Sequence, residues 1–217
     1  MTATHMRGPA DPTGPRSGSG PANEALTELI RARIESSISV KQALAADLDS
    51  SGRVALTLVD AFRRGNALLL FGNGGSAADS QHIAAEFVGR FYLQRRALPA
   101  LALTVNTSAL TALGNDFGFD EVFARQVEAL GRPGDVAMGL STSGRSENVL
   151  RGLRAANAGG LISIGLTGSD PGRIGAEASL CVAVPSTDTP RIQESHILLG
   201  HIWSEVVEVA LFGDPAW

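Results

Sequence analysis

Short apolar runs alternate with helical segments along most of this chain, and no other feature limits its possible folds as strongly. The runs occupy residues 67–71, 100–104, 135–140, 161–166 and 180–184. Two of them lead directly into loops rich in Gly or Ser. Short buried strands separated by helices form parallel sheets that are covered on both faces. The sequence therefore predicts an α/β fold with five parallel strands.

The helical segments have apolar residues mostly three and four positions apart, as Leu26, Leu29 and Ile30 illustrate. Two of these segments precede the first strand, so we expect an extra helical region near the N-terminus. The predicted helices cover residues 22–48, 53–64, 77–88, 146–158 and 192–211.

The 217 residues, 44% of them hydrophobic, suffice for one sizeable core, so we expect a single domain over residues 22–217. Residues 1–21 are rich in Gly, Pro, Ser and Thr, a composition typical of a disordered tail. They lack the apolar stretch of a signal peptide, and no run in the chain approaches the roughly 18 apolar residues of a membrane span. We therefore expect a cytoplasmic protein without a membrane partner. The net charge of -4 also disfavours a nucleic-acid-binding surface, which would be basic.

The loop 141–146 carries four hydroxyl side chains between a predicted strand and a predicted helix. Hydroxyl groups and free backbone N–H groups at a helix start are suited to binding a phosphate. A simple helix cap would explain one such hydroxyl, but not four. The segment 72–76 (Gly-Asn-Gly-Gly-Ser) is a second candidate, although a tight turn explains its glycines equally well. It matches neither the P-loop nor the dinucleotide-binding pattern. Both loops follow strands, where open parallel sheets bind their ligands.

Two polar pairs lie on predicted helices. His82 and Glu86 are four residues apart and share one helix face. Gln193 and His201 are eight apart, which places them on similar faces about 12 Å apart along the axis. His82 and Glu86 could form a plain helical hydrogen bond, or these groups could serve as Zn²⁺ ligands. Spacing alone cannot show that the two helices meet.

In combination, these segments resemble the sedoheptulose-7-phosphate (phosphoheptose) isomerases of the sugar isomerase (SIS) domain superfamily. The resemblance covers about residues 25–212 and consists of several motifs in a fixed order. The motifs are residues 72–76, 82–90 (HIAAEFVGR), 114–119 (GNDFGF), 141–144 (STSG) and 191–194 (RIQE), followed by His196 and His201.

The resemblance implies a flavodoxin-like three-layer α/β sandwich that assembles as a homotetramer, with active sites at subunit interfaces. It also implies one Zn²⁺ per subunit, and the family's metal positions fall on His82, Glu86, Gln193 and His201. The positions implied to bind the phosphate are Ser141, Thr142, Ser143 and Ser146, with Ser76 nearby. Those implied to contact the sugar are Asn73, Gly74, Gly75, Asn115 and Asp116, with Gln193 also assigned to the substrate.

The implied reaction converts sedoheptulose 7-phosphate to D-glycero-D-manno-heptose 7-phosphate through an enediol, a step of heptose biosynthesis. Such chemistry needs a base and an acid, and we assign these roles to Glu86 and His201. Three alternatives remain: a non-catalytic relative that binds a replication initiator protein, a sugar-phosphate-binding regulatory domain, and an isomerase of another sugar phosphate. The first is implied to lack the catalytic Glu and the last-helix His, both of which this chain contains. The second usually accompanies a DNA-binding domain, and residues 1–21 are too short to form one.

Overall fold

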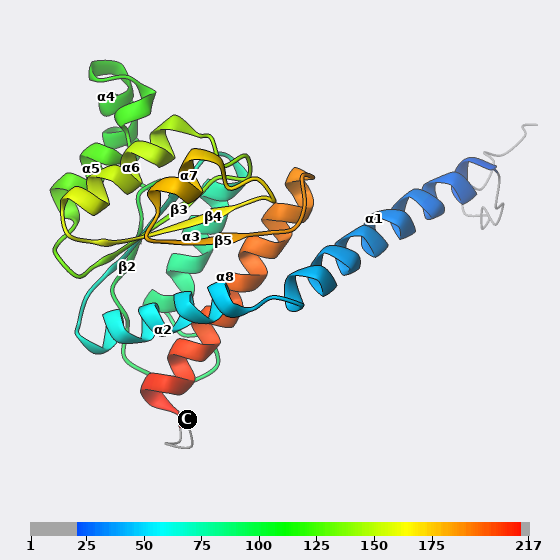
Figure 1. Cartoon of the computed structure of the whole chain (residues 1–217), viewed down its shortest axis with the longest axis horizontal. Coiled ribbons are helices and arrows are strands. Elements are labelled where there is room, and N and C mark those ends of the chain that lie inside the picture. Colours follow the sequence, from blue (N-terminus) through cyan, green and yellow to red (C-terminus); the bar gives the residue numbers. More distant parts are fainter. Residues whose placement is uncertain (1–20, 214–217) are drawn as a thin grey trace, which may run out of the picture. The chain divides into compact units, whose positions relative to one another are not determined.

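The computed structural model describes residues 21–213, and Figure 1 shows the arrangement of their helices and strands. The predicted disordered tail lies outside these residues except for Pro21, which begins the first helix, α1 (Pro21–Ala45). The chain divides into two compact units. The described residues up to Glu35 belong to one unit, and those from Ser36 onward, including the whole sheet, belong to the other. The single-domain organisation stays a prediction.

All five predicted strands are present, and every neighbouring pair is parallel. The order across the sheet is β2-β1-β3-β4-β5. The strands are β1 (Leu68–Gly72), β2 (Ala100–Ala102), β3 (Val136–Leu140), β4 (Ile162–Thr167) and β5 (Leu180–Ala183). The predicted five-stranded parallel sheet is therefore confirmed.

Helices cover both faces of the sheet, so the expected three-layer sandwich is also confirmed (Figure 1). Alternate residues of β1 point into two separate cores, because successive side chains of a strand face opposite sides. Leu68 and Leu70 pack with one set of helices, whereas Leu69 and Phe71 pack with the other. The first set is α2 (Asp49–Arg63), α3 (Gly75–Val88) and α8 (Thr189–Phe212), and the second is α5 (Ala124–Leu130), α6 (Glu147–Ala158) and α7 (Gly172–Glu177).

The structure differs from the predicted elements at several boundaries. The first predicted helix ends at Ala45, and α2 begins at Asp49, four residues earlier than predicted. Helix α4 (Thr107–Asp116), the short η1 (Phe119–Glu121), α5 and α7 were not predicted. Helix α4 buries none of its residues fully, and only Leu110 and Leu113 pack partly against the core, so its apolar pattern is too short to reveal a helix in a sequence. Its start is instead fixed by Asn106, whose side chain accepts a hydrogen bond from the N–H of Ala109.

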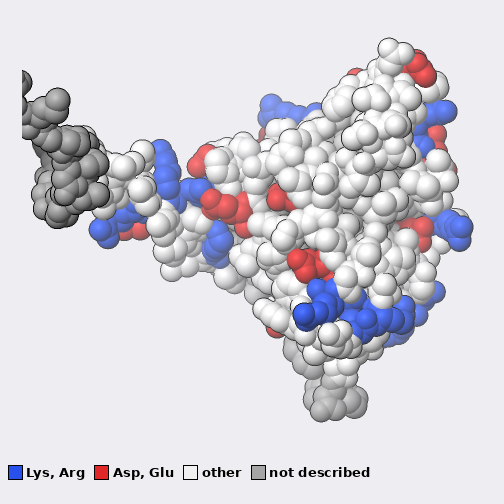
Figure 2. All heavy atoms as spheres, turned by 180° about the vertical axis from the view of Figure 1, so that it is seen from behind, with Lys and Arg blue, Asp and Glu red and all other residues white. Residues whose placement is uncertain are grey.

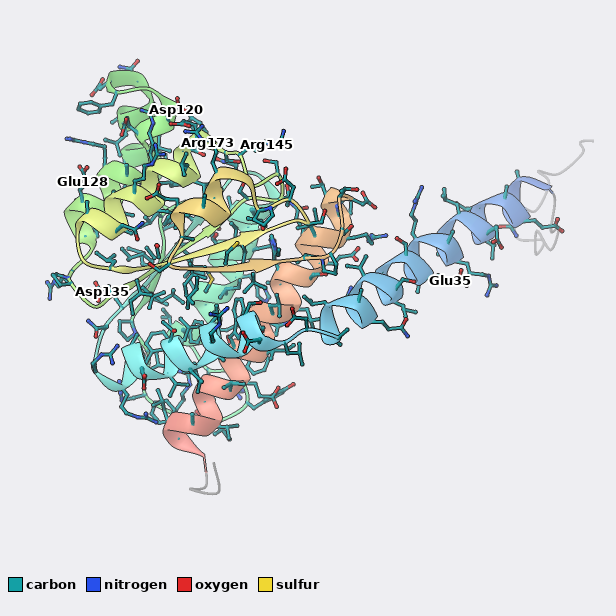
Figure 3. All side chains as sticks on the ribbon, in the orientation of Figure 1. Glu35, Asp120, Glu128, Asp135, Arg145 and Arg173 are labelled. Carbon is teal, nitrogen blue, oxygen red and sulfur yellow. The ribbon has the colours of Figure 1, made fainter. Side chains whose placement is uncertain are left out.

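The amino ends and the carboxyl ends of the strands lie next to different polar groups. At the amino ends of the strands, the buried Asp135 carboxylate accepts hydrogen bonds from the N–H groups of Ala67 and Arg132. Arg145 lies beyond the carboxyl ends, and Figure 3 shows these two residues at opposite edges. The polar loops predicted to bind a ligand therefore lie beyond the carboxyl ends of the strands, as Arg145 does. On the face drawn in Figure 2, most atoms belong to uncharged residues.

Candidate functional site

Helices α3 and α8 position the predicted metal ligands by packing side by side in the same direction. Helix α3 begins in the Gly-rich loop, where Gly74 has a φ of 56° that favours glycine. A Cβ atom on Gly75 would come within 2.5 Å of Nε2 of Gln193, so glycine permits this close approach of α8. Further along, Gly200 of α8 approaches Ile83 of α3 just as closely.

This packing brings His82, Glu86 and His201 together. The Nε2 atoms of His82 and His201 are 2.9 Å apart, and the His82 Nε2 atom is 3.1 Å from Oε1 of Glu86. One ligand atom from each residue lies within 4.8 Å of the others. The predicted proximity of these three residues is therefore present in a single chain.

The donor set of this cluster fits a Zn²⁺ ion. Two donors bound tetrahedrally to zinc at about 2.0–2.1 Å lie roughly 3.3 Å apart, close to the separations of 2.9 and 3.1 Å in this cluster. Two imidazole nitrogens and a carboxylate oxygen are also a common zinc ligand set. The cluster is half-open to solvent, since the His82 side chain is 52% exposed and the Glu86 side chain 22% exposed.

Gln193, the fourth predicted metal ligand, lies on α8 together with His201. Its side-chain amide lies beside Gly75, at the amino end of α3. His201 is eight residues further along α8, which corresponds to about 12 Å. The Gln193 amide therefore lies at the Gly-rich loop.

Asp79 is a polar residue of this region that the sequence interpretation missed. Burial raises the pKa of Asp79 to about 6, although the nearby His82 acts in the opposite direction. Its Oδ2 atom has no hydrogen-bond partner among residues 21–213. The three-residue spacing between Asp79 and His82 on α3 was the available signal.

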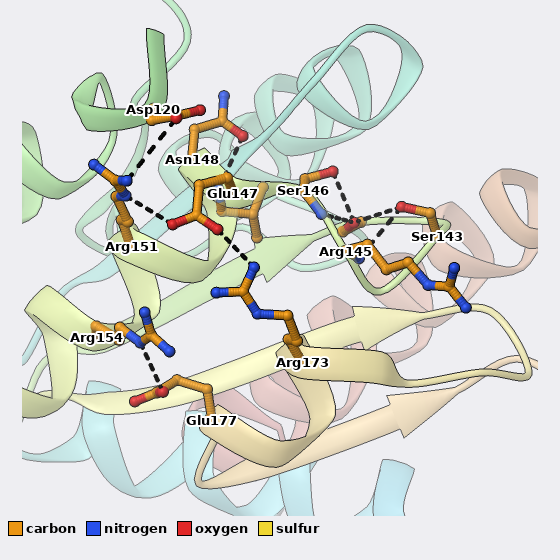
Figure 4. A network of polar contacts seen from close by, with 12 residues as sticks. Asp120, Ser143, Arg145, Ser146, Glu147, Asn148, Arg151, Arg154, Arg173 and Glu177 are labelled. Atoms are coloured by element: carbon orange, nitrogen blue, oxygen red, sulfur yellow. Dashed lines mark hydrogen bonds and ion pairs between the residues drawn. The ribbon is translucent and has the colours of Figure 1, made fainter. Parts of the chain in front are cut away.

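The loop 141–146 forms a compact cluster of hydroxyl groups at the start of α6. The Ser141 Oγ atom lies 2.9 Å from the Ser146 Oγ atom and 3.5 Å from the Ser143 Oγ atom (Figure 4). Thr142 and Ser143 also line a pocket of about 280 Å³, together with residues of the loops 169–170 and 186–187. Hydroxyl groups at the N-terminus of a 12-residue helix favour an anion.

Arg145 extends away from the hydroxyl cluster in Figure 4 and forms an exposed ion pair with Asp170 at 2.7 Å. The hydrogen bond from Arg145 holds the pKa of Asp170 below its usual value. Glu147, the first residue of α6, would oppose an anion, but it accepts hydrogen bonds from Arg151 and Arg173. These two cations offset the negative charge of Glu147 next to the hydroxyl cluster.

The Gly-rich loop and the hydroxyl loop are joined by two amide side chains. Asn73 donates to Oδ1 of Asn148 at 2.8 Å, and Asn148 donates to Oδ1 of Asn73 at 2.9 Å. Asn148 is buried and follows Ser146 by two residues. It was not predicted as a site residue, because nothing in its local sequence indicates a partner 75 residues away.

The remaining predicted residues lie on α3 and α4. Ser76 is buried in the first turn of α3, close to the Gly-rich loop. Asn115 and Asp116 lie exposed at the end of α4, where Asn115 donates to Asp116 at 2.8 Å. No hydrogen bond within the described chain joins these two residues to either loop.

None of the helices between residues 21 and 213 is both long and apolar enough to cross a membrane.

Comparison with known proteins shows the family to which this chain belongs. Residues 34–168 match the family model for the SIS domain. The phosphoheptose isomerases of Aneurinibacillus thermoaerophilus and Roseiflexus sp. (strain RS-1) are 49% and 51% identical over 190 and 191 residues. These matches cover 86% and 88% of this chain and 96% and 97% of the relatives. The structure of phosphoheptose isomerase GmhA from Neisseria gonorrhoeae matches with a TM-score of 0.80 and 44% identity, covering 84% of this chain and 98% of that one. This chain therefore belongs to the phosphoheptose isomerases of the SIS-domain family.

Proposed function

We propose that this protein converts sedoheptulose 7-phosphate to D-glycero-D-manno-heptose 7-phosphate, as an aldose–ketose isomerase of heptose biosynthesis. The observation that carries the proposal is the meeting of His82, Glu86 and His201 from two separate helices. The hydroxyl-rich loop at the start of α6 supports a substrate that carries a phosphate as well as a carbonyl group. The names of the close relatives support the same substrate class.

In the proposed mechanism, Glu86 and His201 move the protons. Glu86 removes a proton from C1 of the ketose, while His201 gives a proton to the carbonyl oxygen at C2, which forms an enediol. His201 then takes the proton from the hydroxyl at C1, and Glu86 returns its proton to C2. The bond changes balance without any further reactant, and the product is the aldose. General acid–base catalysis of this kind contributes typically 10²–10⁴-fold to a rate.

His82, Glu86 and His201 would hold a Zn²⁺ ion, and Gln193 is proposed as a further ligand as well as a substrate contact. When bound, the ion would polarise the sugar's carbonyl group as a Lewis acid. The position of Gln193 beside Gly75 favours its role as a substrate contact.

The two loops at the carboxyl ends of the strands are proposed to bind the rest of the substrate. The hydroxyl groups of Ser141, Thr142, Ser143 and Ser146 bind the phosphate, with Ser76 beside them. Binding energy at the phosphate, remote from the reacting carbons, fixes the position of the sugar chain. The residues proposed to contact the sugar are Asn73, Gly74, Gly75, Asn115 and Asp116.

The enzyme is proposed to act as a homotetramer in the cytoplasm, with active sites at subunit interfaces. Large apolar side chains that are exposed in the single chain support the assembly, because a subunit interface would bury them. In the unit that contains the sheet they include Val88, Tyr92, Leu101, Val105, Phe117, Phe119 and Ile202. The exposed pair Asn115 and Asp116 supports a site that a second subunit completes. The cytoplasmic location and the absence of a nucleic-acid partner stay predictions.

Two substitutions test the assigned roles. Glu86→Gln keeps the shape of the side chain but removes the base, and His201→Ala removes the acid. We expect each variant to fold, to assemble as the wild type does, and to lose at least about 100-fold in kcat. Glu205→Gln is a matched control, because Glu205 is an exposed residue of the same helix as His201. Near-wild-type turnover by either active-site variant would contradict its assigned role.

A further inference from the structure

A buried ion pair joins the segment that follows α3 to α8, and these two helices carry the candidate metal ligands. Nε of Arg95 and Oε1 of Glu208 are 2.8 Å apart, and the two side chains are 0% and 1% exposed. Removing a charged pair from water costs several kcal/mol per ion, so such pairs are weak devices for stability alone. The network around Arg95 and Glu208 suggests a different purpose.

Arg95 binds the end of the helix that carries His82 and Glu86. Its guanidinium group donates to the backbone carbonyl oxygens of Glu86 at 2.7 Å, Phe87 at 2.9 Å and Gly89 at 3.3 Å. The last carbonyl groups of a helix have no partner within that helix, and a cation there also interacts favourably with the helix dipole. Arg95 therefore fixes the last turn of α3, including the backbone of Glu86 itself.

Glu208 connects the same network to His201. The two residues are seven apart on α8, so they lie on one face of the helix. The Glu208 carboxylate accepts hydrogen bonds from the N–H groups of Phe91 at 2.6 Å, Tyr92 at 2.7 Å and Leu93 at 2.9 Å. The Phe91 ring in turn stacks on the His201 ring, with centroids 5.7 Å apart and an interplanar angle of 29°.

The charge of Glu208 is well compensated at this position. Burial alone would raise its pKa, but hydrogen bonds from Phe91, Leu93, Tyr92 and Arg95 outweigh this effect and keep the pKa below its usual value. Both oxygens of the carboxylate have partners, and Arg95 donates to four carbonyl groups as well as to Glu208. A fully satisfied buried network is rigid, so it can hold two helices in a single arrangement.

We infer that Arg95 and Glu208 are positioning residues, which hold Glu86 and His201 at the separation that binds the metal ion. Neither residue is among the proposed metal ligands or substrate contacts. Arg95 acts through the last turn of α3, and Glu208 acts through α8 and through Phe91. This inference rests on the metal site proposed above.

The test measures binding of Co²⁺, whose visible absorption reports the geometry of its ligands, to the full chain after removal of bound metal. Arg95→Lys keeps the charge but cannot span Glu208 and the three carbonyl groups at the end of α3. Glu208→Gln keeps the shape but places an amide NH₂ group where an acceptor is needed. We expect both variants to bind Co²⁺ at least about tenfold more weakly, with an altered spectrum and a lower kcat. We expect KM for the phosphorylated substrate to change little, because the phosphate loop lies elsewhere.

Asp135→Asn is the matched control. Asp135 is also a buried carboxylate that accepts two backbone N–H groups, but it lies at the opposite edge of the sheet (Figure 3). This substitution should lower the melting temperature and leave the affinity for Co²⁺ and its spectrum unchanged.

The inference is overturned if Arg95→Lys and Glu208→Gln bind Co²⁺ as the wild type does. Failure of both variants to fold also contradicts it, because the network would then serve the stability of the whole fold. Absence of Co²⁺ binding by the wild type contradicts the proposed metal site itself, so the two failures are distinguishable.

Discussion

The Nε2 atoms of His82 and His201 lie 2.9 Å apart, although 119 residues separate them in the chain. One residue comes from the helix that follows the Gly-rich loop, and the other comes from the last helix. Close approach at Gly75 and Gly200 allows these two helices to pack. The catalytic proposal depends on this contact.

Ser146→Ala should weaken binding of the phosphate group. Its hydroxyl lies 2.9 Å from that of Ser141 at the start of α6, and a hydrogen bond to a charged group contributes about 1.5–3 kcal/mol. We expect KM to rise about 10- to 100-fold with a smaller change in kcat, as measured by steady-state kinetics. Ser179→Ala is the control, because Ser179 also pairs with another serine, at the start of β5. An unchanged KM in the Ser146 variant would exclude Ser146 from the phosphate site.

Asn148→Leu should impair the reaction without a direct contact to the substrate. The substitution removes both hydrogen bonds that hold the Asn73 side chain. At about 1 kcal/mol each, their loss should lower kcat/KM roughly 10- to 30-fold. Asn157→Leu changes another asparagine of α6, one that bonds to Glu177 instead, and should leave kcat/KM unchanged. Equal kinetics in the two variants would show that Asn73 needs no support from Asn148.

His196 should make the stability of the protein depend on pH. Its ring is fully buried, Nε2 lies 3.1 Å from the Thr167 carbonyl oxygen, and burial lowers its pKa to about 4. The unfolded chain therefore binds the extra proton between about pH 6.5 and 4, so the free energy of unfolding falls as the pH falls through this window. The fall attributable to His196 is at most roughly 3 kcal/mol.

Chemical denaturation of the wild type and of His196→Gln at pH 7, 5.5 and 4.5 measures this effect. Glutamine retains an N–H donor for the Thr167 carbonyl oxygen but does not titrate. The variant should therefore lose less stability than the wild type on acidification. The same loss in both proteins would assign the acid sensitivity to other groups.

The strands could be predicted from the sequence because each is a short apolar run in a sheet buried on both faces. The two candidate ligand loops were also predictable, because the Gly-rich residues 73–76 follow β1 and the Ser-rich residues 141–146 follow β3. The helix α4 was not predicted, because only Leu110 and Leu113 of this helix pack against the core, and both are only partly buried. Helices α5 and α7 are only seven and six residues long, too short for an apolar period to appear.

The site was only partly predictable. The spacing of His82 and Glu86 placed them on one helix face, and the resemblance to a known family suggested His201 as their partner. The contact itself depends on packing of α3 against α8, which no local pattern encodes. The pairs Asn73–Asn148 and Arg95–Glu208 also join distant segments, so neither local sequence indicated a role.

An NMR time course with purified sedoheptulose 7-phosphate tests the central claim most directly. The wild-type protein should convert the ketose into an aldose 7-phosphate with the manno configuration at C2, and in D₂O the product should carry deuterium at C2, provided that the proton on Glu86 exchanges with solvent. Glu86→Gln should leave the ketose unchanged over the same period. No conversion by the metal-loaded wild type, or equal conversion by Glu86→Gln, would contradict the account.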